Sequence, residues 1–333
     1  MPNPRTPDPR RGRRSTLTAA GTALALAAVV GCGGADATGD TEEDTAGGGE
    51  QLEIENCGET YTYTETPQRV VTTGVMAAEM MLALGLEDHI AGTVGATEID
   101  EEYAEEFEEL HVIAEDSFPP PSREVVYEAD PDMVLSTYPD EYGEDALGDR
   151  GELAEDGVNS YLFAGNCGDG HEATMADTYT DLENLGEIFE VSDRAAELTE
   201  EMQDQIAAVE PAEGDPDVFI LGGGTDQPAT VSAHNLVDAL VTEAGGTNIF
   251  PEVTSYSEVS WEEVVDRNPD VILIEDQMFE PADDAIDYMT SSDALSDVTA
   301  VAEEHFVVVG VNDVQPGTRM ADTYAEIAAG LEQ

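Results

Sequence analysis

Arginines are the scarcest charged side chains in this sequence, and two of them could bind a ligand. Beyond Cys32 the chain has six arginines and no lysine against 74 acidic residues. A cation kept in so acidic a chain should have a specific partner, and a guanidinium can hold carboxylate or catecholate oxygens in a forked geometry. We expect Arg150 and Arg319 to contact a ligand. For Arg319, which follows a Pro-Gly turn, a buried pair with a carboxylate that holds the last helix is an equally good explanation.

Four other side chains stand just beyond the ends of expected strands, namely Met76, Tyr138, Tyr256 and Gln277. In open α/β sheets, ligands bind outside the carboxyl ends of the strands. Tyrosine rings offer flat faces to a large ligand, and methionine adapts to an irregular surface. We therefore expect these residues to line a ligand site, with ordinary packing as the alternative for the methionine and the two tyrosines.

The elements that must position these residues alternate between strand and helix patterns. Apolar strands are expected at 70–71, 90–94, 132–136 and 160–163, and again at 218–221, 271–274 and 306–309. Helices are expected between them, for example at 75–84, 234–244, 261–267 and 319–331, together with an amphipathic surface helix at 98–110. This alternation predicts parallel α/β units, which form two halves of the folded chain.

A central helix divides the two halves. Ala195, Leu198, Met202, Ile206 and Val209 follow a spacing of three and four residues, which predicts a helix over 192–210 about 28 Å long. We expect two α/β lobes, at 52–191 and 211–333, joined by this single long helix. The connecting role is inferred from the helix's central position.

The first 51 residues carry an export pattern. Five arginines precede an apolar run over 17–30, which is too short to span a membrane, and the run ends in Val29-Val30-Gly31-Cys32. This end resembles the lipobox of bacterial lipoproteins, which implies a signal peptide over 1–31 and a lipid on Cys32. Residues 32–51 have a composition typical of a flexible acidic tether. An exported chain with two further cysteines, Cys57 and Cys167, suggests one disulfide, with two free buried thiols as the alternative.

Composition and motifs exclude several functions. A net charge of −68 beyond Cys32 excludes nucleic-acid binding, which needs a cationic surface, and indicates adaptation to high salt, where the charges are screened. The sequence lacks the G-x-S-x-G, P-loop and H-E-x-x-H motifs, so we expect no enzyme and no cofactor. His89, His111 and His305 precede strands, on the wrong side for a metal site, so no metal ligand is predicted. A free-metal binder or an exported enzyme are the remaining alternatives outside ligand binding.

An ordered set of segments resembles the metal-chelate family of substrate-binding proteins of ABC transporters, from Cys57 to the end of the chain. The segments are PQRVVTTG (67–74), AAEMMLALGLEDHIAGT (77–93), EADPDMVLS (128–136), AGNC (164–167), AGGTNIF (244–250), EVSWEEVVDRNPDVILI (258–274) and HFVVVGVNDVQPGTRMAD (305–322). The resemblance implies a monomeric lipoprotein on the extracellular face of the cell membrane, with an ABC permease and its ATPase as partners. It also implies a ligand cleft between the two α/β lobes. The first choice of ligand is a ferric siderophore, with cobalamin or haem as the alternatives.

The resemblance also implies one exposed glutamate on each lobe that meets arginines of the permease. Ser260-Trp261-Glu262-Glu263 is a capping box, in which Glu263 has a structural role and Glu262 projects freely. Glu262 matches the second-lobe position. Glu144 is the first-lobe candidate, with Glu141 or Glu152 as alternatives.

Overall fold

The computed structural model describes residues 51–116, 119–143, 146–168, 170–231, 233–277 and 281–332, all in one compact unit that spans residues 48–333. The expected signal peptide, Cys32 and nearly all of the tether lie outside these residues, as does Glu144. Among the helices that are described, none is both long enough and apolar enough to cross a membrane.

The first sheet is wholly parallel, in the order β5-β4-β3-β6-β7. Its strands are β3 (Val70–Thr73), β4 (Ile90–Val94), β5 (Val112–Ala114), β6 (Met133–Ser136) and β7 (Asn159–Leu162), preceded by the antiparallel hairpin of β1 (Leu52–Asn56) and β2 (Glu59–Tyr63). Every residue of β3 and β6 is buried, as expected for parallel strands covered on both faces. The accompanying helices are α1 (Val75–Ala83), α2 (Ala104–Phe107), α3 (Arg123–Tyr127), α4 (Arg150–Glu155) and α5 (Met175–Ile188), with 3₁₀ turns η1 (Glu87–His89), η2 (Glu101–Tyr103), η3 (Pro139–Tyr142) and η4 (Ala164–Asn166).

The second sheet is mixed, in the order β11-β9-β8-β12-β13, with β10 also paired to β8. Its strands are β8 (Asp217–Gly223), β9 (Ala229–Thr230), β10 (Thr247–Asn248), β11 (Ser257–Glu258), β12 (Val271–Asp276) and β13 (Phe306–Gly310), and its helices are α7 (Leu236–Glu243), α8 (Trp261–Arg267), α9 (Ala282–Ser291), α10 (Thr299–Ala302) and α11 (Met320–Leu331). Alternate residues of β8 enter different cores. Val218 and Ile220 pack with α7 and α11, whereas Phe219 and Leu221 pack with α8, α9 and α10.

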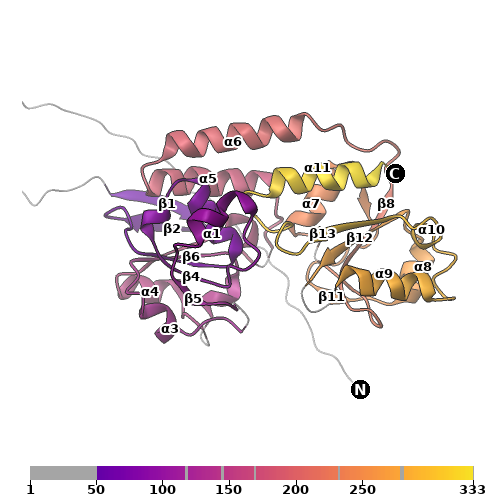
Figure 1. The fold of residues 1–333 in the computed structure, drawn as a ribbon, viewed down its shortest axis with the longest axis horizontal. Helices are drawn as coiled ribbons and strands as arrows, with labels where there is room; N and C mark the ends of the chain where they lie inside the picture. Colours follow the sequence, from indigo (N-terminus) through magenta and orange to yellow (C-terminus); the bar gives the residue numbers. More distant parts are fainter. Residues whose placement is uncertain are drawn as a thin grey trace, which may run out of the picture. The chain divides into compact units, whose positions relative to one another are not determined.

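The expected central helix is present as α6 (Ser192–Ala207), between α5 and β8 in the chain. It packs along both α5 and α11, so it contacts helices that accompany the two different sheets (Figure 1). Its buried residues Ala195, Leu198 and Met202 join a core that is continuous from Val70 of the first sheet to Val218 of the second. The two α/β lobes therefore share one hydrophobic core along this side.

The prediction of one surface helix over 98–110 is wrong. The structure has only the 3₁₀ turn η2 and the single turn α2 in this stretch. Glu98 has a positive φ of 59°, and the Asp100 side chain accepts a hydrogen bond from the backbone N–H of Glu102 at 2.8 Å, which starts the helical region late. The many acidic residues there also repel each other at helical spacing.

Candidate ligand-binding site

A pocket of about 630 Å³ lies where loops from both lobes meet. Its first-lobe residues follow β6 and β7, at the carboxyl ends of these strands, as the strand-end rule predicts. The lining residues are Tyr138, Pro139, Asp140, Gly165, Asn166, Gly168, Gly170, His171, His234, Asn235, Thr254, Ser255, Tyr256 and Gln315. The volume falls within the usual range for small-molecule sites, so the pocket can enclose a small ligand or one part of a large one.

Two predicted ligand residues, Tyr138 and Tyr256, line this pocket, one from each lobe. Burial, together with the nearby carboxylates of Glu141 and Glu275, raises the pKa of Tyr138 to about 12, so its phenol keeps its proton at neutral pH. Tyr256 is 60% exposed and its hydroxyl donates to the carbonyl oxygen of Gly222 at 3.5 Å. Both rings can therefore offer an aromatic face to a ligand.

The remaining lining includes the amides and hydroxyls of Asn166, Asn235, Thr254, Ser255 and Gln315, together with two histidines and one acid, Asp140. The Asn166 side-chain amide donates to the Thr137 carbonyl at 2.7 Å and to the Gln315 side-chain oxygen at 3.5 Å, which joins the two lobes at the pocket. His171 lies 3.2 Å from an oxygen of Asp177, and His234 lies 3.6 Å from an oxygen of Glu172. No lysine or arginine is among the described lining residues. Within the described part of the chain, no cluster of three or more His, Cys, Asp or Glu residues could hold a metal ion.

Two buried carboxyl groups lie close to this pocket, and the sequence did not distinguish them among so many acids. Glu141 accepts hydrogen bonds from the hydroxyls of Thr73 and Ser136, and burial raises its pKa. Glu275 is 7% exposed near the end of β12, and burial raises its pKa to about 7. An acid that directly follows the apolar run VILI (271–274) was the available signal for Glu275. Glu141 gave no such signal.

A match to a known protein family identifies the class of this protein. The family model described as periplasmic binding protein matches residues 70–311, well over half of the chain. The chain belongs to the periplasmic binding protein family. Members of this family are extracytoplasmic proteins that bind small chelates and work with ABC permeases, and they are solute binders, not enzymes.

Relatives of this binding protein include cobalamin-binding proteins from two strains of Halobacterium salinarum. Each is 27% identical over 278 residues, which cover 80% of this chain and 70% of the relative. Among solved structures, a periplasmic binding protein from Veillonella parvula has a TM-score of 0.74 at 25% identity, covering 85% of this chain and 97% of that one. An Fe³⁺-hydroxamate transport protein from Saccharomonospora viridis has a TM-score of 0.71 at 25% identity, covering 85% and 99%.

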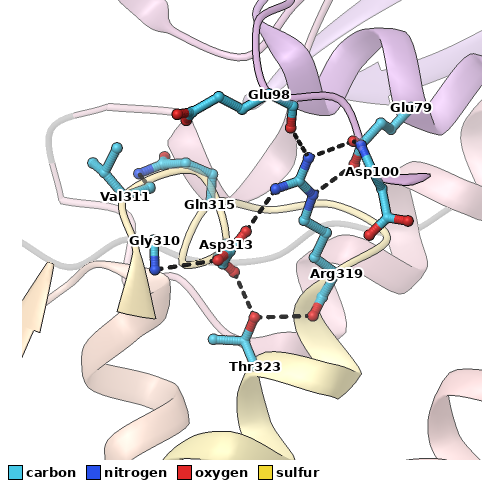
Figure 2. A network of polar contacts seen from close by, with 9 residues as sticks. All are labelled: Glu79, Glu98, Asp100, Gly310, Val311, Asp313, Gln315, Arg319 and Thr323. Carbon is cyan, nitrogen blue, oxygen red and sulfur yellow. Dashed lines mark hydrogen bonds and ion pairs between the residues drawn. The ribbon is translucent and has the colours of Figure 1, made fainter. Parts of the chain in front are cut away.

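Arg319 of this binding protein lies in a protein network rather than in the pocket lining (Figure 2). Its Nε and Nη2 atoms donate to the two carboxylate oxygens of Glu79 at 2.9 and 2.5 Å, and Nη1 donates to Asp313 at 2.7 Å. Nη2 also donates to the carbonyl oxygen of Glu98 at 2.6 Å. Protein oxygens thus accept four hydrogen bonds from the guanidinium. These bonds satisfy most of its N–H donors, which burial keeps away from water. The alternative that the sequence left open for Arg319, a buried carboxylate pair that holds the last helix, describes these contacts.

Arg150, the other arginine expected to contact a ligand, is not among the described lining residues of this pocket. Its Nε donates to the Ser160 hydroxyl at 2.9 Å, and Nη2 donates to Asn56 at 2.7 Å and to the Ser160 carbonyl at 2.9 Å. The guanidinium carbon lies 3.9 Å from the centre of the Tyr61 ring, a cation–π contact. Arg150 therefore fixes the β1–β2 hairpin against β7.

Met76 and Gln277 are also absent from the described pocket lining. Met76 is 1% exposed and packs in the core against Gly317. The contact is close, since a Cβ added to Gly317 would lie only 2.8 Å from the Met76 sulfur. Met76 is thus a core residue, and its assignment to the ligand surface is wrong. The Gln277 side-chain amide donates to the carbonyl oxygen of Gly222, the same atom that accepts from Tyr256. Gln277 therefore orients the strand end behind Tyr256.

The expected disulfide is present in the structure. Cys57 and Cys167 are bonded, with their Cα atoms 5.0 Å apart and a separation of 110 positions in sequence. The bond ties the β1–β2 hairpin to the end of η4, one residue beyond the pocket residue Asn166. It therefore restrains one wall of the pocket.

Proposed function

We propose that this binding protein captures a corrinoid outside the cell and delivers it to an ABC permease. The observation that carries the proposal is the chemistry of the pocket, whose described lining has two tyrosines, several amides and hydroxyls, two histidines and one acid, Asp140, and no lysine or arginine. A corrinoid has a flat, largely apolar ring system with carboxamide side chains at its edge. Such a ligand matches aromatic faces and neutral hydrogen-bonding groups, and it needs no counter-cation.

This proposal changes the order of the ligands expected from the sequence. A siderophore with free carboxylates or catecholates carries negative charge, and its expected partner Arg319 is occupied by Glu79 and Asp313. The name of the Halobacterium salinarum relatives, cobalamin-binding protein, supports the corrinoid. A neutral ferric hydroxamate is the second candidate, because one of the most similar structures belongs to an Fe³⁺-hydroxamate transport system.

Equilibrium dialysis with purified protein tests the ligand. Cyanocobalamin and a neutral ferric trihydroxamate are offered separately, at about 1 M salt so that the acidic chain is screened. We expect saturable binding of one equivalent of cyanocobalamin and much weaker retention of the ferric complex. If only the ferric complex binds, the hydroxamate takes the place of the corrinoid as the proposed ligand. If neither binds, both proposed ligands are contradicted.

We further propose that Cys32 carries a lipid that holds the protein at the extracellular face of the membrane. The support is the order of basic residues, apolar run and lipobox before a tether rich in small and acidic residues. The variant Cys32→Ala should appear in the soluble fraction after the cells are fractionated and washed. A variant that stays with the membrane would contradict the lipid anchor.

A further inference from the structure

His171 stands at the wall of the ligand pocket, where its imidazole ring can reach a bound molecule. It lines this pocket and also a second one of about 420 Å³, which lies beside the disulfide of Cys57 and Cys167. Its side chain is 34% exposed. The backbone N–H of His171 donates to the carbonyl oxygen of Gly168 at 3.1 Å, which holds the residue in the loop after η4. The ring is therefore bordered by open space and attached to a fixed loop.

The two ring nitrogens of His171 have different surroundings. Nε2 is buried and lies 3.2 Å from Oδ1 of Asp177, at ion-pair distance but without the alignment of a hydrogen bond. Nδ1 has no hydrogen-bond partner among the described residues. It is also not buried, since the buried side-chain atoms without a partner include Nε2 of His171 but not Nδ1. Nδ1 is therefore the nitrogen that a ligand can approach.

Asp177 is itself held in place at the start of α5. Its Oδ2 accepts hydrogen bonds from the backbone N–H and the hydroxyl of Thr174, at 2.6 and 3.0 Å, within the capping box of this helix. Its Oδ1 is left to face His171. A carboxylate beside Nε2 favours the tautomer with the proton on Nε2, which leaves the lone pair of Nδ1 available. Histidines that bind metal ions have this arrangement, with a carboxylate at one nitrogen and the metal at the other.

We propose that Nδ1 of His171 coordinates the cobalt of the bound corrinoid. The corrin ring supplies four nitrogen ligands to the cobalt, so a single side chain suffices and no cluster of protein ligands is needed. The step is a ligand exchange on Co(III): the bond from cobalt to a water molecule breaks, the bond from cobalt to Nδ1 forms, and the water leaves. Cobalt keeps its oxidation state. This inference rests on the proposed function, because it is the corrinoid that supplies the cobalt.

Visible absorption spectra of aquacobalamin, whose cobalt carries an exchangeable water, test the coordination. The full-length protein is used at pH 7 and about 1 M salt, which screens the acidic chain. On binding to wild type, the absorption bands should move to those of aquacobalamin mixed with excess free imidazole. On binding to His171→Ala, they should stay those of the water complex. His111→Ala is the control, because His111 is exposed and is not among the described lining residues, and it should keep the wild-type shift.

Cyanocobalamin separates a failure of the coordination from a failure of the proposed function, because a histidine does not displace its cyanide. If wild type binds cyanocobalamin but leaves the spectrum of bound aquacobalamin unchanged, the coordination is overturned and the corrinoid proposal stands. If neither corrinoid binds, both are overturned.

Two further results would overturn the assignment to His171. One is a shift that persists in His171→Ala. The other is a shift that is lost in His234→Ala and kept in His171→Ala, which would move the coordination to the other histidine of the pocket lining. Thermal melting shows that each variant is folded. If the alanine change prevents folding, His171→Gln, which has no ring nitrogen, takes its place with the same expected spectrum.

Discussion

Arg319 at the start of α11 and Glu79 within α1 form a two-bonded ion pair between residues 240 positions apart in the chain. The Glu79 side chain is fully buried, and that of Arg319 is 16% exposed. The same carboxylate accepts from the backbone N–H of Asp100 at 2.7 Å, and the same guanidinium reaches Asp313 (Figure 2). The pair therefore fastens the last helix of the second lobe to the first helix of the first lobe, beside the loop that carries the pocket residue Gln315.

Loss of this pair should lower stability far more than loss of a surface pair. Arg319→Met leaves the Glu79 carboxylate buried without its cation, which should cost about 3–5 kcal/mol of the free energy of unfolding. Arg123→Met is the matched control, because Arg123 pairs with the largely exposed Glu152 and Asp156, and such pairs contribute at most about 1 kcal/mol. Urea unfolding of the three proteins at about 1 M salt measures the difference. Equal stabilities would contradict a fastening role for Arg319.

Ligand titration of the conservative variant Arg319→Lys separates this role from ligand contact. Lysine keeps the charge and loses the fork, so we expect a lower melting temperature with cyanocobalamin affinity close to that of wild type. A large loss of affinity in a variant that melts at the wild-type temperature would instead indicate that Arg319 contacts the ligand.

The fold was predictable where short-range patterns determine it. Apolar runs such as VILI (271–274) and the 3,4 spacing in α6 correctly placed the strands and the central helix. The strand-end rule also pointed to Tyr138 and Tyr256, which line the described pocket, because the rule depends only on where a strand stops. The prediction failed for the charge-rich stretch over 98–110. Its apolar residues have helical spacing, but repulsion between its acidic side chains and the positive φ of Glu98 shorten the helix.

Partners distant in sequence were not predictable from the residues alone. Arg319 meets Glu79 from 240 residues away, and Arg150 meets Asn56 from 94 residues away. With 74 acids beyond Cys32, the sequence offers no means to single out Glu79, Glu141 or Glu275, because what distinguishes them is burial. The scarcity of arginine correctly implied specific partners, but it could not tell a ligand from another part of the protein.

Asp181 should make the stability of the fold fall as the pH rises. It is fully buried beneath η4, where burial raises its pKa to about 8 although the Tyr161 hydroxyl and the Ala164 N–H donate to it. In the unfolded chain an aspartate has a pKa of about 3.9, so between these values folding takes up a proton and stability decreases with pH. Above pH 8 this loss is complete.

The isosteric variant Asp181→Asn removes this titration. Its amide oxygen can still accept from Tyr161 and Ala164, so the variant should gain stability relative to wild type on going from pH 5 to pH 8. Asp204→Asn on the exposed side of α6 is the control, and its difference from wild type should stay constant over that range. Urea unfolding at both pH values measures the change. A difference between Asp181→Asn and wild type that does not depend on pH would contradict this account.

Salt should stabilise the folded protein, because 74 acidic side chains repel each other across the chain beyond Cys32 and only six arginines oppose them. The Debye length shrinks from about 10 Å at 0.1 M to about 3 Å at 1 M, which removes most repulsion between exposed charges. We expect the melting temperature to rise between these two concentrations. Sucrose at matched osmolality, which does not screen charge, should produce a smaller rise. The interpretation fails if the melting temperature is the same at both salt concentrations.

Glu262 is the remaining candidate for contact with the permease. It is exposed in the first turn of α8, where the adjacent Glu263 is engaged by Ser260 in the capping box. A groove of about 370 Å³ lined by Trp261, Val265 and Leu295, among others, opens beside it. An arginine of a permease could therefore pair with Glu262 and lay its aliphatic stem along this groove. On the first lobe, Glu141 is 1% exposed and so cannot dock, Glu152 lies 3.6 Å from Arg123, and Glu144 falls outside the described residues.

Reversing the charge at Glu262 should impair transport without impairing binding. Glu262→Arg replaces an attraction by a repulsion at the docking surface, whereas the pocket, lined by other residues, is untouched. We expect cyanocobalamin affinity within about twofold of wild type, and at least a tenfold loss of uptake, equivalent to about 1.4 kcal/mol of docking free energy. Uptake is measured in cells that carry the native permease and ATPase and have only the variant binding protein. Glu201→Arg, an equally exposed change on α6, should transport normally. If Glu262→Arg also transports normally, the second-lobe contact lies elsewhere.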